Sequence, residues 1–145
     1  MKTPSYQSSD ALTPDEQDEM IELFNNGMIK QVMLGKKISA NMNTTTDQAI
    51  IINSSNYVIR RILVTNASAS LTLGAGGIYT AASKGGTAVV AAGQVYSALT
   101  NSAKILDLTL AVTDRRTEDT LYLSLTSALG STATADIYIF GDKLD

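Results

Sequence analysis

The sequence contains no histidine, no cysteine and no tryptophan among its 145 residues. Without His and Cys, the usual zinc, haem and iron–sulfur ligand sets cannot form, and neither can Ser–His or Cys–His nucleophile pairs or a thiol redox site. These absences remove most familiar enzyme classes. We therefore expect a protein that is not an enzyme and that holds no cofactor and no metal.

Charge is also scarce, because Asp, Glu, Lys and Arg together make up only 17% of the chain, against about 25% in typical domains. Small and hydroxylated residues take their place: Ala, Thr, Ser and Gly account for 58 of the 145 residues. This composition is typical of β-rich proteins with densely assembled surfaces. The length fits one domain with a single core.

The net charge of −3 is unevenly distributed. Residues 1–27 carry one lysine and six acids, whereas the remainder carries ten basic and eight acidic residues. The basic doublets are few and aromatics are only 6% of the chain, so we expect no direct contact with nucleic acid. The chain lacks both an apolar run of about 18 residues and the apolar core of a signal peptide, which predicts no membrane span and synthesis in the cytoplasm without secretion.

Residues 14 to about 25 are predicted to form a short amphipathic helix within an N-terminal arm, residues 1–27. Thr13 is a good N-cap, Pro14 suits the first helical position, and Glu16 can complete a capping box. Gly27 follows two asparagines and provides a stop signal. The apolar stripe of this helix consists of Met20, Leu23 and Phe24. A helix this short is marginal alone, so we expect the stripe to dock on its own body or on a partner.

From residue 28 onward the apolar period changes to 2, which predicts an all-β domain over residues 28–145. Short strands separated by turns every 8 to 12 residues favour a two-sheet antiparallel sandwich, jelly-roll-like in arrangement. One stretch, Val95 to Leu99, is also compatible with a helical turn. The predicted strands are Met28 to Leu34, Lys37 to Met42, Gln48 to Ile52, Tyr57 to Asn66, Ser70 to Leu73, Gly77 to Ala81, Thr87 to Ala91, Lys104 to Val112, Leu121 to Thr126 and Ala135 to Phe140.

The clearest strand is Lys104 to Val112, in which Leu106, Leu108, Leu110 and Val112 alternate with polar or small residues. The alternation predicts that these four side chains face the core. On the same reasoning Asp107 and Asp136 fall on outward rows, where we expect solvated or interfacial acids.

Two surface features are candidate partner-binding sites. Arg115 and Arg116 lie in an acidic connection, residues 114–119, which we interpret as a salt-bridged protruding loop or one that meets a partner, in preference to a cation site. Three outward aromatics, Tyr122, Tyr138 and Phe140, could form a row across adjacent strands. Such a row could be a protein interface, a sugar platform or simple cross-strand packing.

Ser83-Lys84-Gly85-Gly86-Thr87 contains the Lys and Thr of a phosphate-binding P-loop, but Lys84 precedes both glycines and a strand pattern follows. A P-loop needs the opposite order and a helix. We therefore predict a tight turn between two strands.

The region from about Gln48 to Asp142 resembles small structural proteins of tailed bacteriophages. The resemblance lies in the Leu71 to Tyr79 turn, the small-residue run Ala88 to Gly93, and the closing strands Leu121 to Leu125 and Asp136 to Asp142.

The resemblance implies a virion component of the capsid decoration, or cement, type, which would bind the outer capsid surface and reinforce the lattice of the major capsid protein. It also implies a homo-oligomer, with a trimer favoured, and location in the virion. The partner would be the major capsid protein or another virion protein. Alternatives are a neck, tail or head-fibre component and, more distantly, a carbohydrate-binding module using Tyr122, Tyr138 and Tyr79.

Overall fold

A computed structural model describes residues 14–17 and 31–145. The chain divides into two units, residues 1–31 and residues 32–145, which we treat separately. In the first unit, residues 14–17 are helical, at the predicted start of the N-terminal helix. The remainder of that helix, with Met20, Leu23 and Phe24, and the predicted boundary after residue 27 lie outside the described residues.

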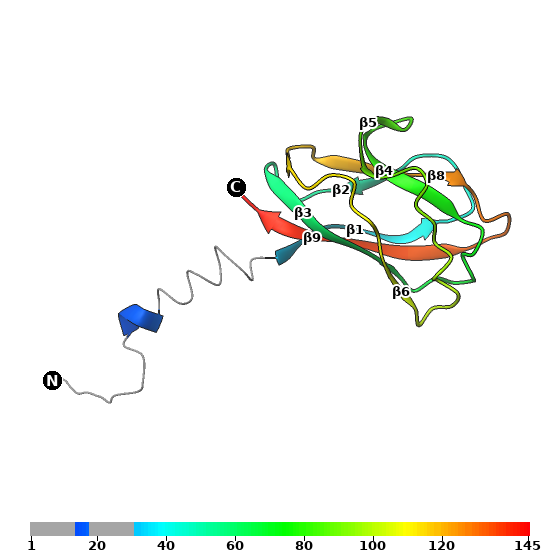
Figure 1. Ribbon diagram of the computed structural model, residues 1–145, viewed down its shortest axis with the longest axis horizontal. Helices are drawn as coiled ribbons and strands as arrows, with labels where there is room; N and C mark the ends of the chain where they lie inside the picture. Colours follow the sequence, from blue (N-terminus) through cyan, green and yellow to red (C-terminus); the bar gives the residue numbers. More distant parts are fainter. Residues whose placement is uncertain (1–13, 18–30) are drawn as a thin grey trace. The chain divides into compact units, whose positions relative to one another are not determined.

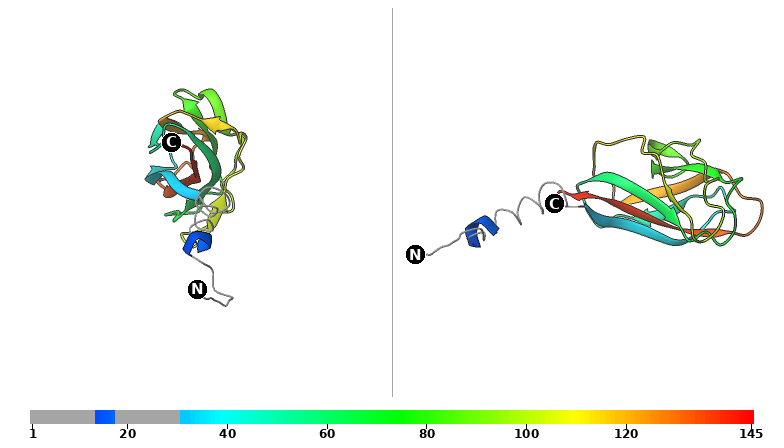
Figure 2. Two further views of the ribbon diagram at one scale, coloured as in Figure 1. Left: turned by 90° about the vertical axis from the view of Figure 1, so that its left-hand side faces the viewer. Right: turned by 60° about the horizontal axis from the view of Figure 1, so that its bottom comes forward.

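The second unit is built from two antiparallel β-sheets, as predicted (Figure 1). The larger sheet has the order β1-β9-β3-β6, with β7 also paired to β3, and the smaller has the order β2-β8-β4-β5. Figure 2 shows this unit from two further sides. The strands are β1 (Gln31–Asn41), β2 (Gln48–Ile51), β3 (Tyr57–Thr65), β4 (Ala75–Ala81), β5 (Gly85–Val90), β6 (Ile105–Asp107), β7 (Arg115–Arg116), β8 (Thr120–Ser127) and β9 (Thr134–Lys143).

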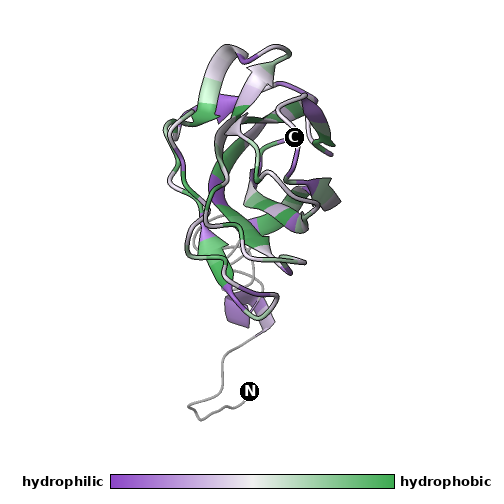
Figure 3. Ribbon diagram, turned by 90° about the vertical axis from the view of Figure 1, so that its right-hand side faces the viewer, coloured by the Kyte–Doolittle hydropathy of each residue, from purple (hydrophilic) through white to green (hydrophobic). Residues whose placement is uncertain are grey.

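The core lies between the two sheets and is lined by alternate residues of the longer strands. Leu121, Leu123 and Leu125 of β8 face Ile137 and Ile139 of β9 across this space in one hydrophobic cluster, all fully buried. Hydrophobic and hydrophilic bands accordingly alternate along the strands (Figure 3). The period-2 pattern therefore correctly predicted the buried faces of these strands.

Several predicted boundaries are wrong. Within the described residues, the two strands expected at 28–34 and 37–42 correspond to one strand, β1 (Gln31–Asn41), in which Ser39 has a φ of 54° and interrupts the regular pleat. Ser70 to Leu73 is a turn, closed by a hydrogen bond from the Gly74 amide to the Leu71 carbonyl. Val95 to Leu99 is not helical, because Val95 forms a β-bridge with Ala75.

The predicted strand Lys104 to Val112 is a connecting segment, here called the strap, whose backbone bonds first to one sheet and then to the other. β6 pairs with β3 for three residues. The Ala111 amide then bonds the Val89 carbonyl of the other sheet at 2.7 Å. Leu106, Leu108, Leu110 and Val112 do pack on the core, as expected. The strap therefore closes the side of the sandwich between β3 and β5 while keeping its apolar face inward.

The opposite side, between β1 and β2, is closed by polar contacts. The Asn53 amide donates to the Leu34 carbonyl at 2.8 Å, and the Asn53 side chain donates to the Met33 carbonyl at 3.2 Å. Further along, the Gln48 side chain bonds both backbone groups of Asn41. The two sheets are thus joined along both sides, and less strand edge is left for pairing with another chain.

Candidate functional site

The predicted partner-binding residues are distributed over three strands. Arg115 and Arg116 form β7 at the edge of the larger sheet, Tyr122 lies on β8, and Tyr138 and Phe140 lie on β9. The N-terminal candidates Met20, Leu23 and Phe24 lie outside the described residues.

The predicted row of three aromatics is not formed. β8 belongs to the smaller sheet and β9 to the larger one, and the residues that alternate with the aromatics on both strands are buried in the shared core. Tyr122 therefore lies on the outside of one sheet, and Tyr138 and Phe140 lie on the outside of the other. Tyr122 pairs in register with Tyr79, but Tyr79 is only 6% exposed. The three outward aromatics cannot make one platform.

Tyr138 and Phe140 instead belong to a mixed surface on the outside of the larger sheet. Leu63 of β3 lies directly opposite Tyr138, and Arg61 lies opposite Phe140. On the other side of β3, Asp107 of β6 lies opposite Leu63. We call this surface the large-sheet face, and it consists of Arg60, Arg61, Leu63, Asp107, Arg115, Tyr138, Phe140 and Asp142.

A β-bulge places two successive arginines on the large-sheet face. The register between β3 and β9 shifts between Ile59 and Arg61. Ile59 and Ile62 are both buried, and the two residues between them are both exposed. The extra residue of a bulge re-aims side chains in this way.

Each of these arginines forms an ion pair on the same face. Arg60 Nε lies 2.8 Å from Asp142 Oδ2, and Arg61 Nε lies 2.9 Å from Asp107 Oδ2. About half of each arginine side chain remains exposed, so solvent screens these pairs and they add little to folding stability. They do hold four charges in fixed positions around Leu63, Tyr138 and Phe140.

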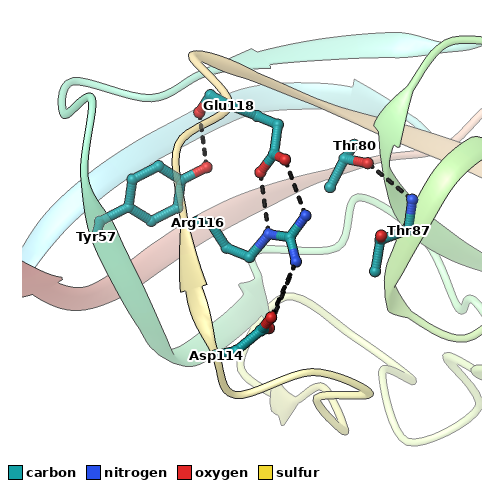
Figure 4. A network of polar contacts seen from close by, with 6 residues as sticks. All are labelled: Tyr57, Thr80, Thr87, Asp114, Arg116 and Glu118. Carbon is teal, nitrogen blue, oxygen red and sulfur yellow. Dashed lines mark hydrogen bonds and ion pairs between the residues drawn. The ribbon is translucent and has the colours of Figure 1, made fainter.

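Arg116 forms a second, inward-directed network (Figure 4). Its guanidinium donates to both carboxylate oxygens of Glu118, at 3.0 and 2.8 Å, and more distantly, at 3.4 Å, to Asp114. The Tyr57 hydroxyl donates to the Glu118 backbone carbonyl at 2.7 Å. The interpretation of residues 114–119 as salt-bridged is confirmed. Both Arg115 and Arg116 pair with β3 through their backbones. The side-chain contacts of Arg116 lie within residues 114–118, whereas the side chain of Arg115 is exposed.

The network also shifts the titration of its members. The hydrogen bonds from Arg116 lower the pKa of Glu118 below its usual value of 4.5, and those to Glu118 raise the pKa of Arg116. Burial, reinforced by the charge of Glu118, raises the pKa of Tyr57 to about 12. Both partners of the Arg116–Glu118 pair therefore stay charged at neutral pH, which keeps the ion pair intact.

Asp136 is not the solvated acid expected from its outward row. It is 8% exposed and accepts hydrogen bonds from the Ser39 amide at 2.8 Å and from the Asn66 side chain at 3.0 Å. Ser39 and Asn66 both have positive φ, 54° and 55°. The Asp136 carboxylate thus provides an acceptor for two donors, from Ser39 and Asn66, that left-handed backbone positions over the sheet. Asp107, by contrast, is exposed as predicted.

Sequence reasoning missed a cluster around the β4–β5 turn. The turn is confirmed: the Gly85 amide bonds the Ala82 carbonyl, and the central residues Ser83 and Lys84 have φ of 59° and 58°. Asp47 accepts from the Ser83 amide at 2.6 Å, and Lys84 Nζ lies 3.0 Å from Ser124 Oγ. The hydrogen bond from the Ser83 amide lowers the pKa of Asp47. Further along this hairpin, the Thr87 amide donates to the Thr80 hydroxyl oxygen at 2.8 Å (Figure 4).

A serine beside a lysine is one form of nucleophile and base. Here, however, Ser124 is fully buried, so no substrate can reach its hydroxyl in this arrangement. The contacts of Asp47 and Lys84 instead pin the hairpin to β8. The only sequence signal for the cluster was the glycine-rich turn itself.

Within residues 14–17 and 31–145, no three Asp or Glu side chains come together as a metal-binding group would require. The same part of the chain contains no helix long and apolar enough to cross a membrane. Comparison with protein-family models, with curated proteins and with solved structures found no match.

Proposed function

We propose that this chain is a structural component of a tailed-phage virion, a decoration protein that binds the outer capsid surface and reinforces the lattice of the major capsid protein. The proposed role is structural, not enzymatic. It would be carried out by a jelly-roll-like sandwich present in many copies.

The observation that carries the proposal is the exposure of large apolar side chains on a sandwich in which hydrogen bonds link the two sheets along both sides. Ile51, Leu73, Val95 and Ile105 are between 54% and 70% exposed. Burying apolar surface contributes roughly 25 cal/mol per Å², so contacts of these side chains with a neighbouring protein would stabilise an assembly. Leu73 and Val95 lie on neighbouring segments, since Val95 bridges to Ala75.

Repetition over a lattice supports the same role. A single contact of modest area gives weak binding, but linked contacts raise the effective concentration of each further contact. In this proposal the predicted stripe of Met20, Leu23 and Phe24 adds an anchoring contact to those of the sandwich. A homo-oligomer, a trimer in the resemblance stated above, would present several such anchors at once.

Copy number in purified particles tests the proposal. Hundreds of copies per virion, visible over the capsid surface by cryo-electron microscopy, are expected. A dozen copies or fewer at the neck, the tail or a head fibre would contradict decoration and favour the alternative virion role. Absence from particles, with binding on a glycan array, would favour the carbohydrate module.

A binding assay on capsids assembled without this chain tests the anchor. The full-length variant Leu23→Ser/Phe24→Ser should lose co-sedimentation with capsids. The matched variant Glu19→Ser/Glu22→Ser, on the opposite side of the predicted helix, should retain it. If the stripe variant binds as well as the unmodified chain, the capsid contact belongs to the sandwich alone.

A further inference from the structure

Charge is divided unequally between the two sheets. The strands of the smaller sheet, β2, β4, β5 and β8, contain no charged residue. The strands of the larger sheet contain seven basic and three acidic residues. Because the whole chain has a net charge of −3, the larger sheet is a positive layer in an acidic protein.

Part of this positive charge has no acidic partner. The four ion pairs within the described residues use the two arginines of β3 and Arg116 of β7, and the other basic residues of the larger sheet form none with the described part of the chain. One of these is Arg115, whose side chain is exposed. Arg115 lies opposite Val58 on the outside of the sheet, since the next residue, Arg116, lies opposite the buried Tyr57. The large-sheet face therefore has an excess of positive charge.

The same face carries apolar side chains. Leu63, Tyr138 and Phe140 are each partly exposed on neighbouring strands. Ile105 of β6 is 64% exposed and points outward, because the next residue, Leu106, packs on the core. Aromatic residues and arginine are the types most enriched in protein interfaces, so the face has the composition of a protein-binding surface.

We infer that the large-sheet face binds a protein surface that presents carboxylates among apolar side chains. The carboxylates pair with Arg115 and with the exposed parts of Arg60 and Arg61, and the apolar groups cover Phe140 and Ile105. The negative charge of the rest of the chain repels such a partner elsewhere, which directs it to this face.

Nucleic acid and anionic membranes also seek positive charge, but the face suits them less well. Asp142 and Asp107 hold Arg60 and Arg61, and both aspartates would oppose the closely spaced phosphates of either ligand. A protein surface can instead place its carboxylates apart and fill the space between them with apolar contacts.

This inference deepens the proposed function and rests on it for the source of the partner, the outer capsid surface. It names the face by which the sandwich would meet that surface, and the charge that the surface would present.

Synthetic peptides test the chemistry of the partner without the capsid. The probe is an amphipathic peptide of Leu and Glu at helical spacing, compared by fluorescence anisotropy with the same peptide carrying Gln or Lys in place of Glu. The unmodified chain should bind the Glu peptide about 10-fold more tightly than the Gln peptide and lose this preference as salt is added. The Lys peptide should bind most weakly.

Two charge variants of equal net charge locate the binding surface. Arg61→Glu/Arg115→Glu should weaken binding of the Glu peptide about 10-fold and strengthen binding of the Lys peptide, and the second effect also shows that the variant folds. Lys2→Glu/Lys84→Glu moves the net charge from −3 to −7 as well but changes other parts of the chain, and should bind like the unmodified chain.

The inference is overturned if the unmodified chain does not bind the Glu peptide, or if the two variants bind it equally. Tighter binding of single-stranded oligo-dT or of phosphatidylglycerol vesicles than of the Glu peptide would also overturn it. Self-association of the unmodified chain that Arg61→Glu/Arg115→Glu abolishes would do the same, because a second copy would then cover the face.

Co-sedimentation with capsids assembled without this chain separates the inference from the proposed function. Binding of the Glu peptide without binding of capsids would count against the proposed function alone. Capsid binding that Arg61→Glu/Arg115→Glu leaves intact would count against the inference alone.

Discussion

The side-chain amide of Gln48 pairs with the backbone of Asn41 as a neighbouring strand would. The Asn41 amide donates to Gln48 Oε1 at 2.8 Å, and Gln48 Nε2 donates to the Asn41 carbonyl at 2.7 Å. Asn41 is the last residue of β1, an edge strand of the larger sheet. Unpaired edge groups invite pairing with another chain, and Gln48 occupies them.

Replacing Gln48 by leucine should therefore lower the free energy of unfolding by about 1 kcal/mol, since both backbone groups of Asn41 lose a partner. Glu at this position retains an acceptor for the amide but has no donor for the carbonyl, so Gln48→Glu should also destabilise. Urea unfolding measures both effects. Thr45→Ala, at an exposed position of the same turn, is the control and should change stability by less than about 0.5 kcal/mol. Equal stability of all three variants would contradict the role of Gln48.

Glu118 should make stability depend on pH in the acidic range. Its pKa is lower in the folded chain than the usual 4.5 because Arg116 donates to its carboxylate. A lowered pKa means that the carboxylate contributes stability above 4.5 and loses that contribution as the pH falls through the folded value. Glu118→Gln should cost about 1–2 kcal/mol at neutral pH, and the difference from the unmodified chain should shrink below pH 4.5.

Asp114→Asn provides the matched control for Glu118. Asp114 lies 3.4 Å from the same guanidinium and its side chain is 68% exposed, so its removal should change stability by less than about 0.5 kcal/mol. Urea unfolding of both variants over a pH series separates the two. A constant difference between Glu118→Gln and the unmodified chain at all pH values would show that Glu118 does not titrate as proposed.

The sequence predicted buried faces better than strand partners. The alternation in Leu121 to Thr126 and Ala135 to Phe140 correctly identified the inward residues. It could not tell that the two strands belong to different sheets. Their connection is held between the sheets by Met42, whose amide bonds the Ala133 carbonyl and whose carbonyl accepts from the Leu129 amide. Alternation is a local property, whereas these contacts link residues that are distant in sequence.

The difference between local alternation and distant backbone partners also explains why the strap was predicted as one strand. Leu106, Leu108, Leu110 and Val112 alternate like a long strand, and they do face the core. Their backbone, however, bonds first to β3 and then to β5. An apolar period of 2 requires only that one face is buried, and a segment that closes the side of a sandwich meets this condition without one continuous partner.

The candidate site residue Arg116 and the outward acid Asp136 show what a local sequence pattern can and cannot predict. The acidic neighbours of Arg116 indicated ion pairs, because partners two residues away are visible in the sequence. Asp136 is covered by Ser39, 97 residues away, and by Asn66, 70 residues away. Both of these contacts with Asp136 depend on left-handed backbone at the non-glycine residues Ser39 and Asn66, and the sequence pattern does not indicate such backbone.

The β4–β5 turn allows opposite effects from two neighbouring substitutions. Ser83 and Lys84 both have positive φ, where a side chain costs about 1–2 kcal/mol and glycine costs nothing. Ser83→Gly keeps the amide that bonds Asp47, so we expect a gain of about 0.5 kcal/mol after the entropy cost of glycine. Lys84→Gly also removes Nζ from the buried Ser124 hydroxyl and should be destabilising. If both variants are stabilised equally, the Lys84–Ser124 contact contributes nothing.

Gly141 should tolerate no side chain, because β9 lies against β3 at this residue. It pairs with Ile59, and a Cβ built on Gly141 would overlap the Val58 carbonyl oxygen and crowd Ile59 Cα. Both obstacles are backbone atoms and cannot rotate away, so the strands would have to separate. Gly141→Ala should therefore lower the free energy of unfolding by about 2–3 kcal/mol.

Gly93 has nothing within 4 Å of its built Cβ, so Gly93→Ala should leave the free energy of unfolding unchanged or raise it by up to about 0.5 kcal/mol. Thermal unfolding compares the two variants, and equal melting temperatures would refute the close approach of β9 and β3.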